Sequence, residues 1–256
     1  MDIAAYLERI NYRGSTRPSA ESLRDLHRAH LLAVPFENLD IHLGNPILLD
    51  EDALFEKIVH KQRGGFCYEL NGLFAALLRE LGFRVAMLNS LIPETHNGCG
   101  MVYDHPILLV ELDERWIVDV GFGDAYRLPL KLDDGGEQMG VGVAYRISPD
   151  GDGRWTFRER LENGEWEFYY AFTLQPCRLG DFTEACRYYE SSPKSGFTQK
   201  RICSRATLEG HISLNDDRLI VTRNDQRHEM PLAGGQDFVR ALNEHFGISF
   251  EKGDLP

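Results

Sequence analysis

The sequence lacks the features of a secreted protein, of a membrane-spanning protein and of a protein stabilised by a structural metal. Its five cysteines are odd in number and include no Cys-x-x-Cys pair, which argues against a disulfide framework and against a zinc knuckle. No stretch reaches the roughly 18 apolar residues needed to cross a bilayer, and the first ten residues lack the basic-then-apolar pattern of a secretory signal. We therefore expect a cytoplasmic protein with free thiols and no metal site.

Basic residues are fewer than acidic residues. The chain has 28 Lys and Arg against 40 Asp and Glu, a formal net charge of -12. This charge opposes binding to a nucleic-acid backbone or to an anionic membrane. An anionic small cofactor is still possible, because a few local basic groups or backbone N–H groups can hold phosphates. We expect small-molecule partners and a monomer or homodimer.

The pattern of the 256 residues predicts an α+β fold in three blocks. Residues 1–84 read as a helical bundle, with Ser19 or Ser22 capping one helix. Residues 85–190 contain short β-type runs separated by turn residues, as expected for an antiparallel, barrel-like sheet. Residues 191–256 mix strands with one amphipathic helix and form an α/β lid. No internal repeat interrupts this plan.

A cysteine in the segment RGGFCYELN, residues 63–71, is the strongest chemical signal. The glycine pair is expected to allow a sharp turn that delivers Cys67 to the first turn of a helix. A helix N-terminus and a nearby histidine both favour a thiolate, so we expect the pKa of this thiol to be lowered. The alternative is a small buried core residue.

A cysteine nucleophile needs a base and a group that orients the base. Of the nine histidines, His105 stands apart because it opens the apolar run HPILLVELD. Asp119 interrupts the next apolar run, where a carboxylate is costly to bury without a partner. A two-residue turn between the two runs would put the two side chains on opposite faces of the sheet. A three-residue loop over residues 112–114 places Asp119 opposite Ile107 and makes His105 its diagonal neighbour.

Five segments in this order resemble the arylamine N-acetyltransferase family. They are VPFENLDI at 34–41, RGGFCYELN at 63–71, the strand that begins at His105, VDVGFG at 118–123 and SPKSGF at 192–197. The resemblance implies a cysteine-protease-like core with a triad of Cys67, His105 and Asp119. It also implies a ping-pong reaction, in which Cys67 takes an acetyl group from acetyl-coenzyme A and passes it to an arylamine or arylhydrazine.

The same resemblance implies further site residues. An apolar acceptor pocket would contain Phe36, Phe122 and Phe197. The glycine-rich loop that precedes His105 would supply backbone N–H groups to the oxyanion and the cofactor, from Gly100, Met101, Val102 and Tyr103. The chain ends at Pro256 with a short tail, whereas several relatives continue further, so the resemblance does not extend to coenzyme A contacts made by a longer C-terminus.

Three other functions remain open on the sequence. A macrolactam-forming amide synthase would keep the triad and resolve the acyl group with an aromatic amine of the bound chain itself. A papain-like or transglutaminase-like hydrolase has Cys, His and Asp in the same chain order. A binding module with a decayed site would have an inert Cys67.

Overall fold

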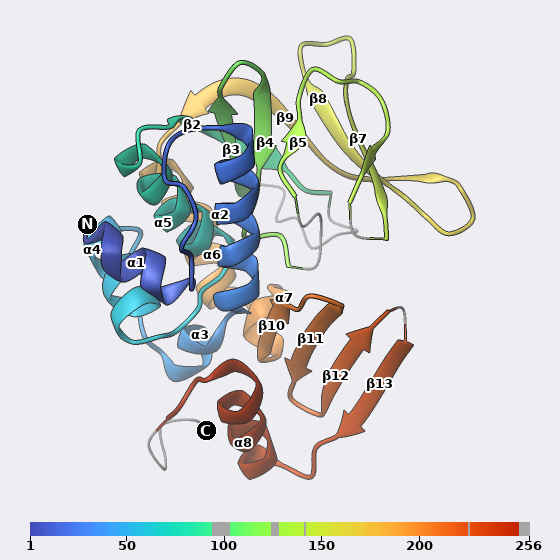
Figure 1. The fold of residues 1–256 in the computed structure, drawn as a ribbon. Coiled ribbons are helices and arrows are strands. Elements are labelled where there is room, and N and C mark those ends of the chain that lie inside the picture. The colour runs from blue at the N-terminus through green and yellow to red at the C-terminus, as the bar shows by residue number, and fades with distance from the viewer. Residues whose placement is uncertain (94–102, 124–127, 141, 225, 251–256) are drawn as a thin grey trace.

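The computed structural model describes residues 1–93, 103–123, 128–140, 142–224 and 226–250. It has three groups of elements, shown in Figure 1 as helices at the left, a large sheet at the upper right and a smaller sheet with one helix at the lower right. This arrangement confirms the α+β fold class. Within the described residues no helix combines the length and apolar character needed to cross a membrane.

The N-terminal group is helical. Its elements are α1 (Ile3–Arg9), α2 (Ala20–Ala33), α3 (Leu39–Leu43), α4 (Glu51–Phe55), the π-helix η1 (Glu56–His60) and α5 (Cys67–Glu80). Ser19 caps α2 as predicted, because its hydroxyl accepts a hydrogen bond from the Ser22 N–H at 3.1 Å. Helix α5 is buried on nearly all sides, so its apolar residues hold it in the centre of the molecule.

Eight antiparallel strands form the large sheet in the order β5-β4-β3-β2-β9-β8-β7-β6. They are β2 (Arg84–Leu91), β3 (His105–Glu111), β4 (Arg115–Val118), β5 (Leu130–Lys131), β6 (Gln138–Met139), β7 (Ala144–Pro149), β8 (Trp155–Arg160) and β9 (Trp166–Cys177). The side-chain amide of Gln138 joins the two ends of the sheet, since it bonds both the N–H and the C=O of Lys131 at 2.7 Å. The sheet is therefore a nearly closed barrel.

The C-terminal part begins with helices, continues with a second sheet and ends with one more helix. Its elements are the 3-10 helix η3 (Leu179–Phe182), α6 (Thr183–Ser191), α7 (Gly196–Gln199), β10 (Ile202–Ala206), β11 (Gly210–Asn215), β12 (Arg218–Arg223), β13 (Gln226–Pro231) and α8 (Gly235–Phe246). The second sheet has the order β1-β10-β11-β12-β13, so its first strand, β1 (Phe36–Glu37), comes from the helical region. Helix α6 also packs into the core around α5. The predicted block boundaries at residues 84 and 190 remain a prediction.

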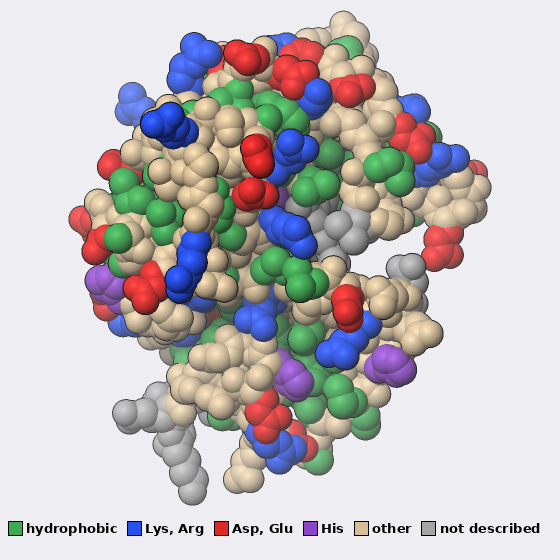
Figure 2. All heavy atoms as spheres, viewed as in Figure 1, with side chains coloured by type: hydrophobic (Ala, Val, Ile, Leu, Met, Phe, Trp, Pro, Cys, Tyr) green, Lys and Arg blue, Asp and Glu red, His purple; other side chains and the backbone are tan. Residues whose placement is uncertain are grey.

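Three hydrophobic cores stabilise this arrangement. One lies between the helices and the outer face of β2, β3 and β4, a second fills the barrel, and a third lies between the second sheet and α8. Successive strand residues alternate between the first two cores, as Leu108 and Ile107 do. The outer surface seen in Figure 2 intermixes acidic and basic side chains.

Candidate active site

Cys67 occupies the first position of α5, as the sequence predicts. The preceding glycines matter for close packing rather than for a sharp turn, because neither has a positive φ. A Cβ on Gly64 would lie 2.0 Å from the carbonyl oxygen of Pro35. This contact lets Gly65 form a bridge with Phe36, so the start of α5 is held against β1. The predicted position of Cys67 is confirmed, but the predicted reason for the glycine pair is wrong.

A buried ion network lies beneath the start of α5. Glu69 accepts a hydrogen bond from the Phe66 N–H at 3.0 Å and contacts Lys57 at 2.7 Å. Lys57 also contacts Asp40 at 2.7 Å, and Asp40 in turn bonds Arg63. Burial lowers the pKa of Lys57, but the surrounding carboxylates outweigh it and raise that pKa overall. The helix start is thus held by charge-assisted hydrogen bonds.

His105 and Asp119 are in contact. The Nε2 atom of His105 lies 2.7 Å from Oδ2 of Asp119, and both side chains are buried. Strands β3 and β4 pair Leu108 with Val118, and continuing that register puts Asp119 opposite Ile107. The predicted three-residue loop is therefore confirmed. Because the carboxylate accepts the Nε2 proton, the other ring nitrogen, Nδ1, is the basic one.

Asn71 joins the helix of Cys67 to both strands. Its amide nitrogen donates to Oδ1 of Asp119 and to the carbonyl of Pro106, each at 2.8 Å. Its amide oxygen accepts the N–H of Val120 at 2.9 Å. Asn71 is fully buried and lies one turn after Cys67. A single side chain thus fixes the helix relative to the segments that carry His105 and Asp119.

Two more contacts hold Asp119 in place. The Gly121 N–H donates to Oδ1 at 2.7 Å, and Nε2 of His27 lies 2.9 Å from the Asp119 carbonyl oxygen. His27 comes from α2 and is fully buried. The carboxylate therefore has one oxygen saturated by N–H donors and the other directed at His105.

The thiol of Cys67 differs from the expectation. Burial, followed by the carboxylates of Asp119 and Asp104, raises its pKa well above the ordinary value, while the Tyr68 backbone N–H lowers it. The predicted lowering was wrong for the thiol taken alone, because the helix start is buried beside carboxylates. Release of this proton to water is unfavourable, so a thiolate here requires a neighbouring group that takes the proton.

A cavity of about 350 Å³ brings Cys67 and His105 together with the three predicted phenylalanines. Its lining residues are Phe36, Cys67, Ile92, Asp104, His105, Gly121, Phe122, Gly123, Tyr169, Tyr189 and Phe197. Phe122 packs edge-on against the His105 ring with centroids 5.1 Å apart, and the ring centroids of Phe36 and Phe197 are 6.0 Å apart. The three phenylalanines named from the sequence therefore line one cavity with the thiol and the imidazole.

The predicted N–H donors are only partly within the described residues. Gly100, Met101 and Val102 lie outside them. Tyr103 is described, and its ring packs against Phe182 with centroids 5.6 Å apart. Among the described residues no group of three or more His, Cys, Asp or Glu side chains is arranged to hold a metal ion.

Sequence reasoning missed Asn71, His27 and a second buried carboxylate in the cavity wall. Asp104 accepts hydrogen bonds from the Tyr189 hydroxyl at 2.8 Å and from the Ile92 N–H at 3.1 Å. Asn71 lies inside the segment RGGFCYELN, four residues after Cys67, and this helical spacing predicts that it shares a helix face with Cys67. Neither Asp104 nor His27 carries a comparable signal in the sequence.

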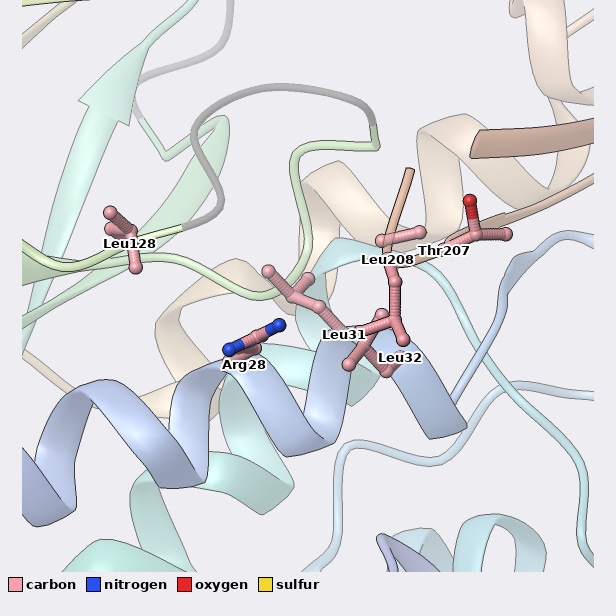
Figure 3. Close-up of a pocket in the computed structure, with 7 residues that line it drawn as sticks. Arg28, Leu31, Leu32, Leu128, Thr207 and Leu208 are labelled. Carbon is pink, nitrogen blue, oxygen red and sulfur yellow. The ribbon is translucent and has the colours of Figure 1, made fainter. Parts of the chain in front are cut away.

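A second cavity, of about 290 Å³, lies between α2 and the turn that follows β10. Figure 3 shows Arg28, Leu31 and Leu32 projecting from α2 toward Leu128 and Leu208. The seven described residues that line it include neither a thiol nor a carboxylate, so this second cavity lacks the nucleophile and the acidic group of the first one.

Comparisons with known proteins agree on one family. A family model described as N-acetyltransferase matches residues 19–255. Arylamine N-acetyltransferase 1 of Homo sapiens is 33% identical, over 100% of this chain and 97% of the human protein. The structure of arylamine N-acetyltransferase from Salmonella typhimurium has a TM-score of 0.89 at 31% identity, covering 98% of this chain and 92% of its own. The structure of the Mycobacterium marinum enzyme in complex with CoA has a TM-score of 0.87 at 31% identity, covering 96% of this chain and 93% of its own.

Proposed function

The chain belongs to the arylamine N-acetyltransferase family, and from that premise we propose that it transfers an acetyl group from acetyl-coenzyme A to an aromatic amine or hydrazine through Cys67. One observation carries the proposal. The His105 imidazole, bonded to Asp119 at 2.7 Å, lines the same cavity as the Cys67 sulfur. A thiol and a base in one cavity, with a buried carboxylate that orients the base from behind, are the parts that acyl transfer needs.

In the first half-reaction the Cys67 proton passes to Nδ1 of His105. The raised pKa of the thiol makes this transfer the route to the thiolate, since the charges of the imidazolium and of Asp119 then stabilise each other. The sulfur bonds to the acetyl carbon while the thioester bond of the donor breaks. His105 returns the proton to the departing coenzyme A thiolate, which leaves acetylated Cys67.

In the second half-reaction the acceptor nitrogen attacks the acetyl carbon on Cys67. His105 takes the proton that the amine loses, and the bond between the carbon and the Cys67 sulfur breaks. The thiolate regains a proton from His105, and the free enzyme is restored. A neutral aromatic amine needs little activation at neutral pH, which suits a site with one base.

The cavity supports a small acceptor. Its volume of about 350 Å³ lies at the low end of the range for small-molecule pockets, and its aromatic walls match a flat ring. This size favours a simple arylamine over the long acyl chain of a macrolactam precursor. The relative solved in complex with CoA supports coenzyme A as the carrier. Backbone donors at residues 100–103 and a cytoplasmic location stay predictions.

Initial rates test the proposed function. With acetyl-coenzyme A and 4-methoxyaniline varied together, a ping-pong route gives parallel double-reciprocal lines. Lines that intersect would contradict a covalent intermediate, and steady hydrolysis of a peptide amide would support the hydrolase instead. The Cys67→Ala variant serves as the control, and it should release no coenzyme A thiol above background.

A further inference from the structure

A pair of glutamates at the barrel rim lies beside the candidate active-site cavity. Glu159 on β8 and Glu167 on β9 are direct cross-strand partners, so their side chains leave the sheet on the same face. Glu159 and Phe157 lie two residues apart on one strand, and Phe157 is buried in the barrel core. The two carboxylates therefore extend the inner face of the barrel toward its rim. Like charges that face each other in this way destabilise a sheet.

A β-bulge connects this pair to the cavity. Strand β8 pairs Phe157 with Tyr170 but Arg158 with Phe168, so Tyr169 is the extra residue. A bulge re-aims its side chain. The ring of Tyr169 lies 5.8 Å from those of both Phe157 and Phe122, and Tyr169 lines the cavity with Cys67. The bulge thus turns Tyr169 inward at the cavity wall.

Tyr169 also binds one of the two glutamates. Its side chain is hydrogen-bonded to that of Glu159. Burial, Glu159 and Glu167 together raise the pKa of Tyr169 to about 12, and burial followed by Glu167 raises the pKa of Glu159. The hydroxyl is therefore a neutral donor at neutral pH, and its partner carboxylate lies directly behind the cavity wall.

Among the described residues, the charges around the cavity are one-sided. The described residues that line it include the carboxylate of Asp104 and no Lys or Arg. Asp119 stands behind His105, and Glu159 and Glu167 stand behind Tyr169. In a partly desolvated cavity these charges oppose a ligand that carries a carboxylate of its own.

We propose that the charges of Glu159 and Glu167, which lie behind Tyr169, make the enzyme select neutral or cationic aromatic acceptors and reject anionic ones. The inference rests on the proposed function, and it concerns the charge of the acceptor ring's substituent. A carboxylate on the acceptor is repelled at the cavity wall, whereas an amide or an ammonium group is accepted. The two glutamates are specificity-determining residues and take no part in the transfer of the acetyl group.

The test compares three acceptors of similar size in the full-length enzyme with acetyl-coenzyme A. These are 4-aminobenzoate, which is anionic, 4-aminobenzamide, which is neutral, and 4-aminobenzylamine, which is cationic at neutral pH. We expect kcat/KM for the amide to exceed that for the benzoate by about ten-fold or more, from a repulsion of ordinary size for partly buried charges. In Glu159→Gln/Glu167→Gln the amide-to-benzoate ratio should fall about ten-fold toward one. Comparing this ratio between variants cancels the intrinsic reactivity of each amine.

Control variants separate a local charge effect from a global one. Glu162→Gln removes a negative charge at an exposed turn and should leave the ratio unchanged. Tyr169→Phe keeps the ring and loses the bond to Glu159, so it should alter the ratio less than the double variant does. An unchanged ratio in the double variant, or equal use of benzoate and amide by the wild type, would overturn charge selection. Failure of all three acceptors would instead overturn the proposed function, and the wild-type comparison stands even if a variant does not fold.

Discussion

Gly121 and Cys67 touch through their backbones. A Cβ on Gly121 would lie 2.7 Å from the Cα of Cys67 and 2.8 Å from the amide nitrogen of Asn71. The segment that follows Asp119 therefore lies directly against the first turn of α5. This contact needs a glycine because there is no space for a side chain, and it sets how far the sulfur can lie from the imidazole.

The contact predicts a strong effect of Gly121→Ala. The added methyl group must push the helix start away from the strand, and a displacement of about 1 Å in a reacting group can cost about 100-fold in rate. We expect kcat/KM to fall about 100-fold with the far-UV circular dichroism unchanged. Gly180→Ala is the matched control, since a Cβ there meets nothing within 4 Å. Equal activity of the two variants would show that the contact is unimportant.

Asn71→Ala should destabilise the protein. It leaves the Pro106 carbonyl, the Val120 N–H and one hydrogen bond of Asp119 without a partner in a buried region. Each buried unsatisfied group costs about 1–3 kcal/mol, so the free energy of unfolding should fall by about 3 kcal/mol or more. Urea denaturation measures this change. Asn163→Ala, at an exposed turn, is the comparison variant. A similar small loss of unfolding free energy in both variants would show that Asn71 does not fix the helix relative to the strands.

The positions of His105 and Asp119 could be predicted only in part from the sequence. Alternation along β3 and the burial cost of Asp119 single out these two residues, but the local pattern is compatible with either a two-residue turn or a three-residue loop between the strands. The observed register gives the loop 112–114, which puts the two side chains on one face. The pKa of Cys67 depends instead on how deeply α5 is buried and on Asp104, a residue 37 positions away in the chain. Likewise β1 joins a sheet whose next strand starts at residue 202, and local pattern does not reveal such pairings.

Asp119→Asn should abolish most activity while leaving the fold intact. Oδ1 of residue 119 accepts N–H donors from Asn71 and Gly121, so an asparagine must keep its oxygen there. Its amide nitrogen would then face Nε2 of His105 and donate to it. The histidine would carry its proton on Nδ1 and could not accept the proton of Cys67. From the known cost of a wrong tautomer we expect kcat to fall about 10⁴-fold. A fall in kcat of less than about ten-fold would show that Asp119 does not orient His105 for catalysis.

The reactivity of Cys67 should depend on His105 in a specific direction. Burial and nearby carboxylates raise the pKa of the thiol taken alone, so without His105 the thiolate forms only at high pH. In the proposed mechanism His105 takes this proton within the protein, so the sulfur should react near neutral pH. We expect His105→Gln to slow alkylation by iodoacetamide at pH 7 and to shift the rate profile to higher pH. If both proteins reacted at the same rate across the pH range, this role of His105 would be contradicted. If Cys67 of the wild type did not react at all, the alternative of a binding module with a decayed site would be favoured.

The most direct measurement is the intact mass of the protein after incubation with acetyl-coenzyme A in the absence of any amine. The account predicts a mass increase of one acetyl group, mapped to Cys67 by peptide analysis, lost on adding an arylamine and absent in Cys67→Ala. A wild-type chain that keeps its original mass, yet still acetylates an arylamine, would contradict transfer through the Cys67 sulfur.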